Sequence, residues 1–178
     1  MIKTPVLRLL AVSFLVAALS ACGFHLRNSI ALPADLGPVR VVSTTPYSPL
    51  GDALVKGLQH AGATPAAVDA KDVATLQILS ERWGDLPISI DAQGRAQEFS
   101  LRYATIFVFR RADGSELVPR QAVELSRDYV SPPQNVTGTT TEREVIADEL
   151  RREMAASILR RVDGVIQGGA QQDKSATP

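Results

Sequence analysis

The residue with the clearest chemical role in this sequence is its single cysteine, Cys22. It ends the segment Leu19-Ser20-Ala21-Cys22, a leucine and two small residues before a cysteine. This is the pattern of the bacterial lipobox, in which the thiol receives a diacylglycerol and the chain is cut before the cysteine. The new amino group is then acylated. We therefore expect Cys22 to be a lipid-attachment site, and the alternative is an ordinary cysteine beside a signal-peptide cleavage site.

The segment that precedes this cysteine supports the lipobox interpretation. Residues 1–21 contain Lys3 and Arg8, no acidic residue, and a short apolar stretch. A basic start, an apolar run and small residues before the cut are typical of a secretory signal peptide. The run is shorter than the roughly 20 apolar residues that cross a bilayer, so a retained membrane helix is the weaker alternative.

The lone cysteine is also consistent with an exported, acylated protein. With no second cysteine the chain can form no internal disulfide, and acylation of Cys22 leaves no free thiol in an oxidising compartment. Gly23 follows the cysteine where an inner-membrane retention signal would have aspartate. Lipoprotein sorting rules then predict a protein anchored by its lipid in the outer membrane, on the periplasmic side.

Little else in the sequence points to catalysis. The two histidines, His25 and His60, have no partner at metal-ligand spacing, and no nucleotide-binding or hydrolase motif is present. The 19 basic and 19 acidic residues balance, which gives no reason to expect nucleic-acid binding. We expect a protein that is not an enzyme and has neither a metal nor a cofactor. The alternative is a triad of distant serine, histidine and acid.

Hydrophobic periodicity predicts six elements. They are strands at 39–44, 75–90, 99–109 and 121–129, a helix over 48–62, and a long helix from a capping box at Thr141 and Glu144 to 166. Ser48 and Pro49 have the chemistry of a helix start, and Pro87 predicts a bulge or an edge position in the second strand. The last residues, 167–178, are polar and are predicted to form a disordered tail.

The order β-α-β-β-β-α predicts an α/β fold of the α+β type. We expect a two-layer sandwich with a four-stranded mixed sheet and two helices on one face. The apolar stripe of the long helix, from Ile146 to Ile166, is predicted to pack on the sheet, with partner binding as the alternative. The other face would stay open and could bind an amphipathic ligand.

Three stretches of the chain resemble one known family. Residues 22–27 (CGFHLR), 48–58 (SPLGDALVKGL) and 142–150 (EREVIADEL) resemble the lipopolysaccharide-assembly lipoproteins of the LptE family, and the likeness predicts one LptE-like domain over 22–166. The resemblance implies an outer-membrane lipoprotein that plugs and helps assemble the β-barrel of LptD. It also implies assistance in inserting lipopolysaccharide into the outer leaflet, and direct binding of that lipid.

The resemblance suggests which residues carry these contacts. The family's aromatic-basic pair for lipopolysaccharide is replaced here by Asp91-Ala92, which leaves the arginines Arg95 and Arg102 as the candidates. Arginine suits phosphates because its planar fork binds them bidentately, although each could equally be a solvated surface residue. Phe24, Leu26 and Arg27 are predicted to contact the bilayer surface or the barrel wall. Two other functions remain open, a free lipid-anchored periplasmic lipid carrier and a lipid hydrolase.

Overall fold

The computed structural model describes residues 32–33, 36–67, 69–131 and 136–175. Its elements are β1 (Val39–Ser43), α2 (Pro49–His60), β2 (Ala74–Ile90), β3 (Ala96–Arg110), β4 (Glu116–Val130) and α3 (Val136–Ser175). The strands form one four-stranded sheet in the order β1-β2-β3-β4. Strand β1 pairs parallel with β2, and the other neighbours are antiparallel. The predicted α+β fold with a mixed sheet is confirmed.

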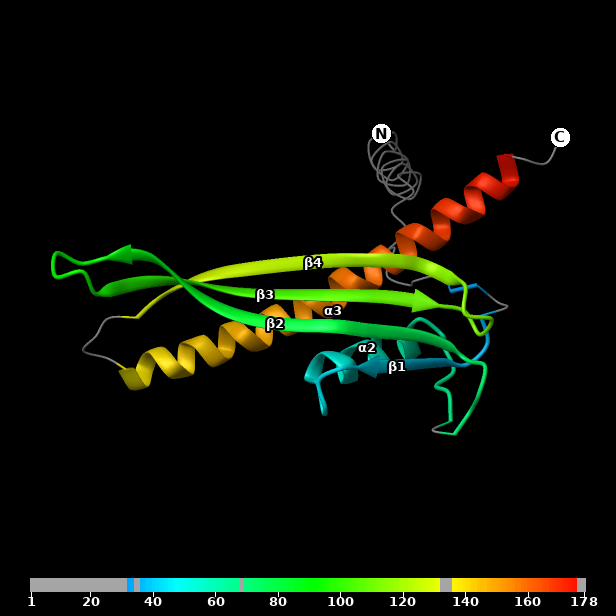
Figure 1. The fold of residues 1–178 in the computed structure, drawn as a ribbon, viewed down its shortest axis with the longest axis horizontal. Coiled ribbons are helices and arrows are strands. Elements are labelled where there is room, and N and C mark those ends of the chain that lie inside the picture. The colour runs from blue at the N-terminus through cyan, green and yellow to red at the C-terminus, as the bar shows by residue number, and fades with distance from the viewer. Residues whose placement is uncertain (1–31, 34–35, 68, 132–135, 176–178) are drawn as a thin grey trace, which may run out of the picture.

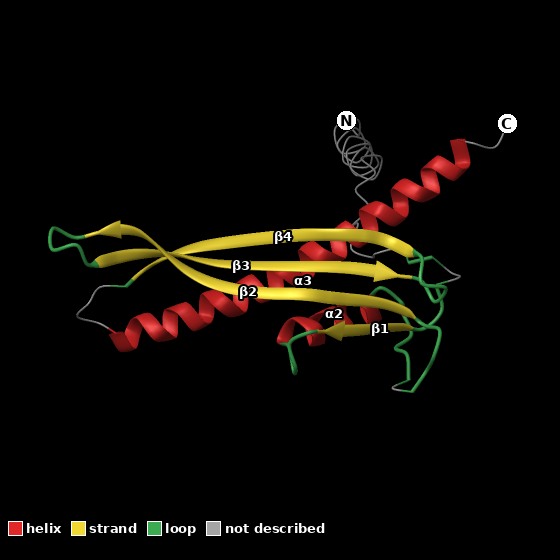
Figure 2. Cartoon of the chain, viewed as in Figure 1, coloured by secondary structure: helices red, strands yellow, loops and turns green. Residues whose placement is uncertain are grey.

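Both helices lie on the same face of the sheet, and α3 crosses the strands obliquely (Figures 1 and 2). The core between the two layers contains Leu76 and Ile78 of β2, Phe107 of β3 and Ile158 of α3, all with no exposed surface. Burial of these side chains, about 1.5–3 kcal/mol each, holds the helices on the sheet.

Helix α2 begins as its sequence predicts. Ser48 is the N-cap and its Oγ accepts a hydrogen bond from Gly51 N, while Pro49 is the first helical residue. Leu50, Leu54 and Leu58 recur every four residues and are buried on one face. Gly62, with φ of 89°, follows the last turn in the left-handed conformation that glycine adopts easily.

Helix α3 is longer than predicted at both ends. It starts at Val136, so Thr141 lies inside the helix and the predicted capping box at Thr141 and Glu144 is wrong. It also continues to Ser175, through most of the segment predicted as a disordered tail (167–178). Once packing has nucleated a helix, each further residue gains one hydrogen bond, so extension costs little free energy. Local composition is therefore a weak guide to where the helix ends.

Register shifts in β2 decide which way its side chains point. The β2–β3 pairing shifts register between Ile78 and Ser80 and again after Pro87, where a bulge was predicted. Before the first shift, even-numbered residues such as Leu76 and Ile78 face the helices. After it, Arg82 lies opposite Ala104 and Trp83 opposite Tyr103, so odd-numbered residues face the helices.

Candidate functional site

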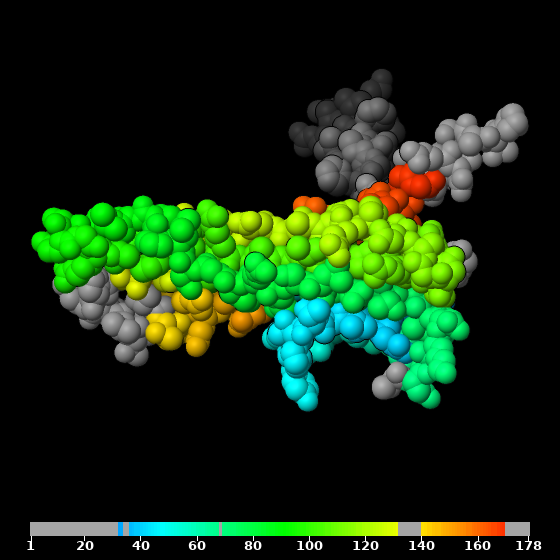
Figure 3. All heavy atoms as spheres, viewed as in Figure 1, coloured from blue at the N-terminus to red at the C-terminus, as the bar shows by residue number. Residues whose placement is uncertain are grey.

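The face of the sheet that turns away from the helices is the candidate functional site. Neither helix covers it, and it is built by the three long strands (Figure 3). We call this surface the open face. Its middle carries Arg102 of β3, which lies between Gly84 of β2 and Ser126 of β4. Gly84 has no side chain, so the Arg102 guanidinium stands beside open surface.

A second arginine lies next to Arg102 on the open face. Arg82 pairs with Ala104 and Gly84 pairs with Arg102, which makes the two arginines diagonal neighbours on adjacent strands. Such neighbours are about 7–8 Å apart, close enough for long side chains to share one ligand. Sequence analysis missed Arg82, since alternation from Leu76 and Ile78 assigns even positions to the core. The bulge near Leu79 reverses which positions face the core. Recognising that bulge in the sequence would have placed Arg82 on the open face.

The arginine pair is available to an outside ligand. Arg102 Nη1 lies 3.6 Å from Glu124 Oε1, with both side chains more than half exposed, 53% and 58%. An exposed ion pair of this kind contributes at most about 1 kcal/mol. A phosphate, which binds arginine through charge-assisted bidentate hydrogen bonds, can therefore replace Glu124 as the partner of Arg102.

Exposed apolar side chains begin next to Arg102 at Leu86 and continue along the sheet to the β2–β3 hairpin. Leu86 is 44% exposed and occupies the row next to Arg102, opposite Ser100. We define the distal apolar patch as four residues with 44–68% exposure at this end of the sheet: Leu86, Ile88, Ile90 and Val130. Cationic and apolar groups side by side suit an amphipathic anion.

The other candidate, Arg95, is not part of this arrangement. It lies in the β2–β3 turn, where its Nε contacts Asp91 Oδ2 at 2.8 Å. Since Arg95 and Arg102 are separated by most of a strand at about 3.3 Å per residue, they are roughly 20 Å apart. The structure therefore does not bring the two predicted arginines together, and instead pairs Arg102 with Arg82.

Asp91 organises the turn around Arg95. Its Oδ1 accepts hydrogen bonds from the N–H groups of Gln93 and Arg95, both at 2.9 Å, and its Oδ2 accepts one from Gln97 Nε2 at 3.0 Å. The backbone N–H of Arg95 is the main reason that the pKa of Asp91 is lowered to about 2. These contacts give Arg95 a structural role within its own hairpin.

Polar contacts on the opposite face hold α3 against the part of the sheet that carries the site. Arg143 binds the Asp85 carboxylate through two hydrogen bonds of 2.8 Å, and Tyr129 donates its hydroxyl to the same carboxylate at 2.9 Å. The Arg143 guanidinium lowers the pKa of Asp85, against the opposing effect of burial. Further along α3, Arg127 of β4 pairs with Glu153 at 2.8 Å.

An aromatic stack continues this attachment toward α2. Trp83 and Tyr103 stack with centroids 3.8 Å apart, and the Arg151 guanidinium lies 5.1 Å from the Trp83 ring centroid. Tyr103 donates its hydroxyl to Glu81 at 2.9 Å. The pKa of Tyr103 is raised mainly by burial and, to a smaller extent, by the Glu81 carboxylate. Glu81 also accepts from Ser48 Oγ at 2.7 Å, which joins the α2 N-cap to the sheet.

Other site predictions fall outside what the structure describes. Cys22, Phe24, Leu26 and Arg27 lie outside the described residues, so their roles stay predictions. Among the described residues, no group of three or more His, Cys, Asp or Glu side chains could hold a metal ion. Across the described ranges, no helix has both the length and the apolar character needed to cross a membrane.

An α+β domain with helices on one face, and arginines beside apolar side chains on the other, has the features of a binding or assembly protein. The LptE family model, described as lipopolysaccharide-assembly, matches residues 36–162. The chain therefore belongs to the LptE family. The resemblance is confirmed, and the family gives the protein a role in lipopolysaccharide assembly. This is a family of non-enzymatic lipopolysaccharide-transport lipoproteins, which confirms that the protein is not an enzyme.

Curated relatives agree with this assignment. The LPS-assembly lipoprotein LptE of Photorhabdus laumondii is 28% identical over 154 residues, covering 86% of this chain and 82% of the relative. The protein of the same name from Yersinia pestis (strain Pestoides F) is 29% identical over 159 residues, covering 86% of this chain and 73% of the relative.

Solved structures support the fold alone. Lipoprotein B from Nitrosomonas europaea has a TM-score of 0.63 at 23% identity, covering 84% of this chain and 96% of that one. A minor lipoprotein from Acinetobacter baumannii has a TM-score of 0.61 at 15% identity, covering 74% and 94%.

Proposed function

We propose that this lipoprotein plugs the β-barrel of LptD, helps it assemble, and assists insertion of lipopolysaccharide into the outer leaflet. Family membership supports this proposal, because the family acts in lipopolysaccharide assembly. The lipid on Cys22 would hold the protein at the outer membrane, on the periplasmic side.

The observation that carries the lipid-binding part of the proposal is the diagonal pair of Arg82 and Arg102 beside exposed Leu86. Lipopolysaccharide has phosphates next to acyl chains, so one molecule could meet both guanidiniums and the distal apolar patch. Arg95, at the hairpin tip, would bind a lipid phosphate only after its ion pair with Asp91 is broken. We therefore assign the main contact to Arg102 and Arg82.

A free lipid carrier is the less favoured function. Such a carrier needs an enclosed apolar cavity for acyl chains, whereas the apolar side chains between the sheet and the helices are packed together. Tyr103, Phe107, Leu150 and Met154 have essentially no exposed surface. A lipid is more easily accommodated on the open face, against a partner that covers it.

The test is purification of the full-length protein, tagged at Pro178, from detergent-solubilised outer membranes. We expect a near-stoichiometric large β-barrel that remains bound at high salt, together with lipopolysaccharide. Recovery of the lipoprotein alone, or with phospholipid only, would contradict the plug proposal and favour the carrier.

A further inference from the structure

One edge of the sheet, along β1, has backbone groups that no described residue satisfies. Strand β1 pairs with β2 on one side. On the other side, Val39 donates its N–H to Thr64 O and accepts one from Ala66 N, both at 2.9 Å. Because peptide groups alternate along a strand, the N–H and C=O of Val41 and Ser43 point to this same outer side. Thr44, an even-numbered residue, points its N–H the other way and donates it to Ile78 O of β2 at 3.2 Å.

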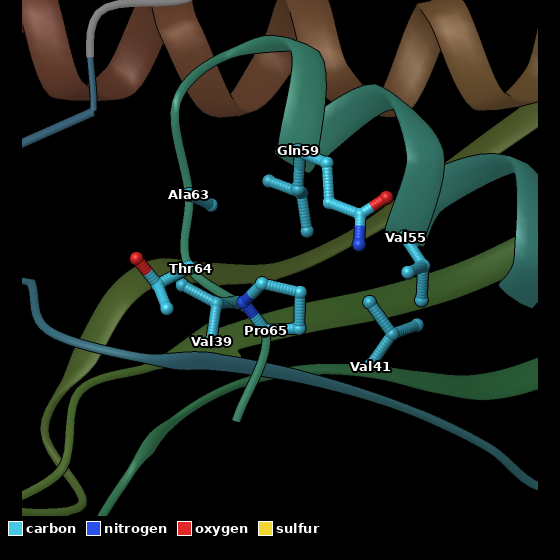
Figure 4. A pocket seen from close by; sticks show the side chains of 8 residues that line it. Val39, Val41, Val55, Gln59, Ala63, Thr64 and Pro65 are labelled. Atoms are coloured by element: carbon cyan, nitrogen blue, oxygen red, sulfur yellow. The ribbon is translucent and has the colours of Figure 1, made fainter. Parts of the chain in front are cut away.

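A groove between β1 and α2 runs beside this edge. Val41 of β1 and Val55 of α2 face each other across it, with Pro65 at one end (Figure 4). Toward the other end the groove widens to a volume of about 220 Å³, lined also by Ser43, Tyr47 and Asp52. The groove therefore has apolar walls, one acidic side chain and a strand edge that no other described residue pairs with beyond Val39.

Tyr47 marks the far end of the groove. Its side chain is fully exposed, at 100%, and its backbone has a φ of 54°. This left-handed conformation is unfavourable for an aromatic residue and is found where the surrounding structure imposes it. An exposed aromatic ring is a common anchor in protein interfaces.

The other edges of the sheet are protected against strand addition. On β4, Pro119 interrupts the strand, and Arg161 and Arg127 donate to the outer carbonyls of Ala122 and Ser126, each at 3.3 Å. On β2 beyond β1, register shifts bound the edge near Leu79 and after Pro87, and the stretch between them carries the charged residues Glu81, Arg82 and Asp85. Proline, bulges and charged side chains are the devices by which proteins block edge pairing. The segment from Val41 to Ser43 has none of them.

We propose that the β1 edge binds an extended segment of a partner polypeptide as an added strand. Resting on the proposed function, we assign this segment to the barrel protein. Residues 64–66 already form backbone hydrogen bonds with this edge at Val39. The partner segment would form backbone hydrogen bonds with Val41 and Ser43. An acyl chain could fill the groove but could not bond these backbone groups. The segment would place a small apolar side chain against Val55 and a basic one near Asp52.

The test compares backbone hydrogen exchange in the isolated lipoprotein and in the complex purified from outer membranes. We expect the amides of Val41 and Ser43 to exchange at least about tenfold more slowly in the complex, since a backbone partner protects them. If the barrel co-purifies but both amides exchange as in the isolated protein, the added strand is disproved and the proposed function stands. If no barrel co-purifies, both proposals fail.

Variants test the groove independently. Val55→Lys places a charge in the groove, and we expect it to reduce the recovered barrel about tenfold. Val145→Lys, at an exposed valine of α3, is the matched control and should leave recovery unchanged. Equal recovery with a folded Val55→Lys protein would contradict the proposal. Concentration-dependent protection of the two amides in the isolated protein, with a doubled mass, would instead identify a second copy as the occupant.

Discussion

Arg143 of α3 and Asp85 of β2 form a bidentate ion pair, with two nitrogen–oxygen distances of 2.8 Å, between residues 58 positions apart in the chain. The pair joins the N-terminal part of α3 to the half of the sheet that carries the distal apolar patch. Tyr129 bonds the same carboxylate, so three elements meet at one group.

Removing this ion pair should loosen α3 from the sheet. We expect Asp85→Asn to lower the free energy of unfolding by about 1–2 kcal/mol at neutral pH, because hydrogen bonds to charged groups are lost at a partly exposed site. Denaturant unfolding measures the change. Asp148→Asn, which affects only a local pair with Arg151 on α3, is the control and should have a smaller effect.

The same pair predicts a pH dependence. The folded pKa of Asp85 is lowered, so its contribution to stability is complete above the unfolded pKa of about 3.9. The contribution is lost as the pH falls through the folded pKa. The difference in unfolding free energy between wild type and Asp85→Asn should therefore be constant above about pH 5 and shrink below pH 4. A difference that grows with acidification would contradict this assignment.

Asp91 should hold the β2–β3 turn together. We expect its carboxyl to titrate with a pKa of about 2 in an NMR experiment, because the N–H of Arg95 and other donors bind the charged form. Asp91→Ala should speed hydrogen exchange at Gln93 and Arg95. Asp113→Ala, which removes the acceptor of Ser115 N in the β3–β4 turn, should leave those two amides unchanged. A pKa of Asp91 near 3.9 would show that the turn is open in solution.

The arginine pair on the open face makes a prediction about lipopolysaccharide. The double variant Arg82→Ala, Arg102→Ala should weaken binding of purified lipopolysaccharide about tenfold or more and reduce its salt dependence, since two charge-assisted contacts are lost. Lysine at both positions should restore binding only in part, because lysine lacks the planar fork. Arg152→Ala, on exposed α3 surface, is the control. Equal binding by the double variant would exclude the pair as the contact.

Gly57 of α2 lies against the Leu159 side chain of α3. A Cβ added at this position would overlap Leu159 Cδ1. Gly57→Val should therefore lower the free energy of unfolding by about 1–3 kcal/mol through overpacking. Gly164→Ala in α3, where nothing lies within 4 Å of an added Cβ, should instead raise it by up to about 1 kcal/mol. Thermal unfolding of both variants distinguishes the two effects.

Much of the fold could be predicted because it depends on local patterns. Leu50, Leu54 and Leu58 follow the helical period and are buried, and Leu101, Tyr103 and Phe107 follow the strand period and are buried. The ends of α3 could not be predicted in this way. The capping residues at Thr141 and Glu144 were overridden, since helix propagation from a packed centre outweighs a local cap signal.

By itself, the sequence determined the order of elements, the buried stripes, the family and the expectation of a lipid anchor at Cys22. Only the tertiary structure decided which side chains share a surface. The bulge near Leu79 turns Arg82 to the open face beside Arg102, and strand length separates Arg95 from both. It also decided that, among the described residues, the outer edge of β1 is paired only at Val39, because neighbours in a sheet are distant in sequence. Alternation along one strand specifies neither its register nor its partner.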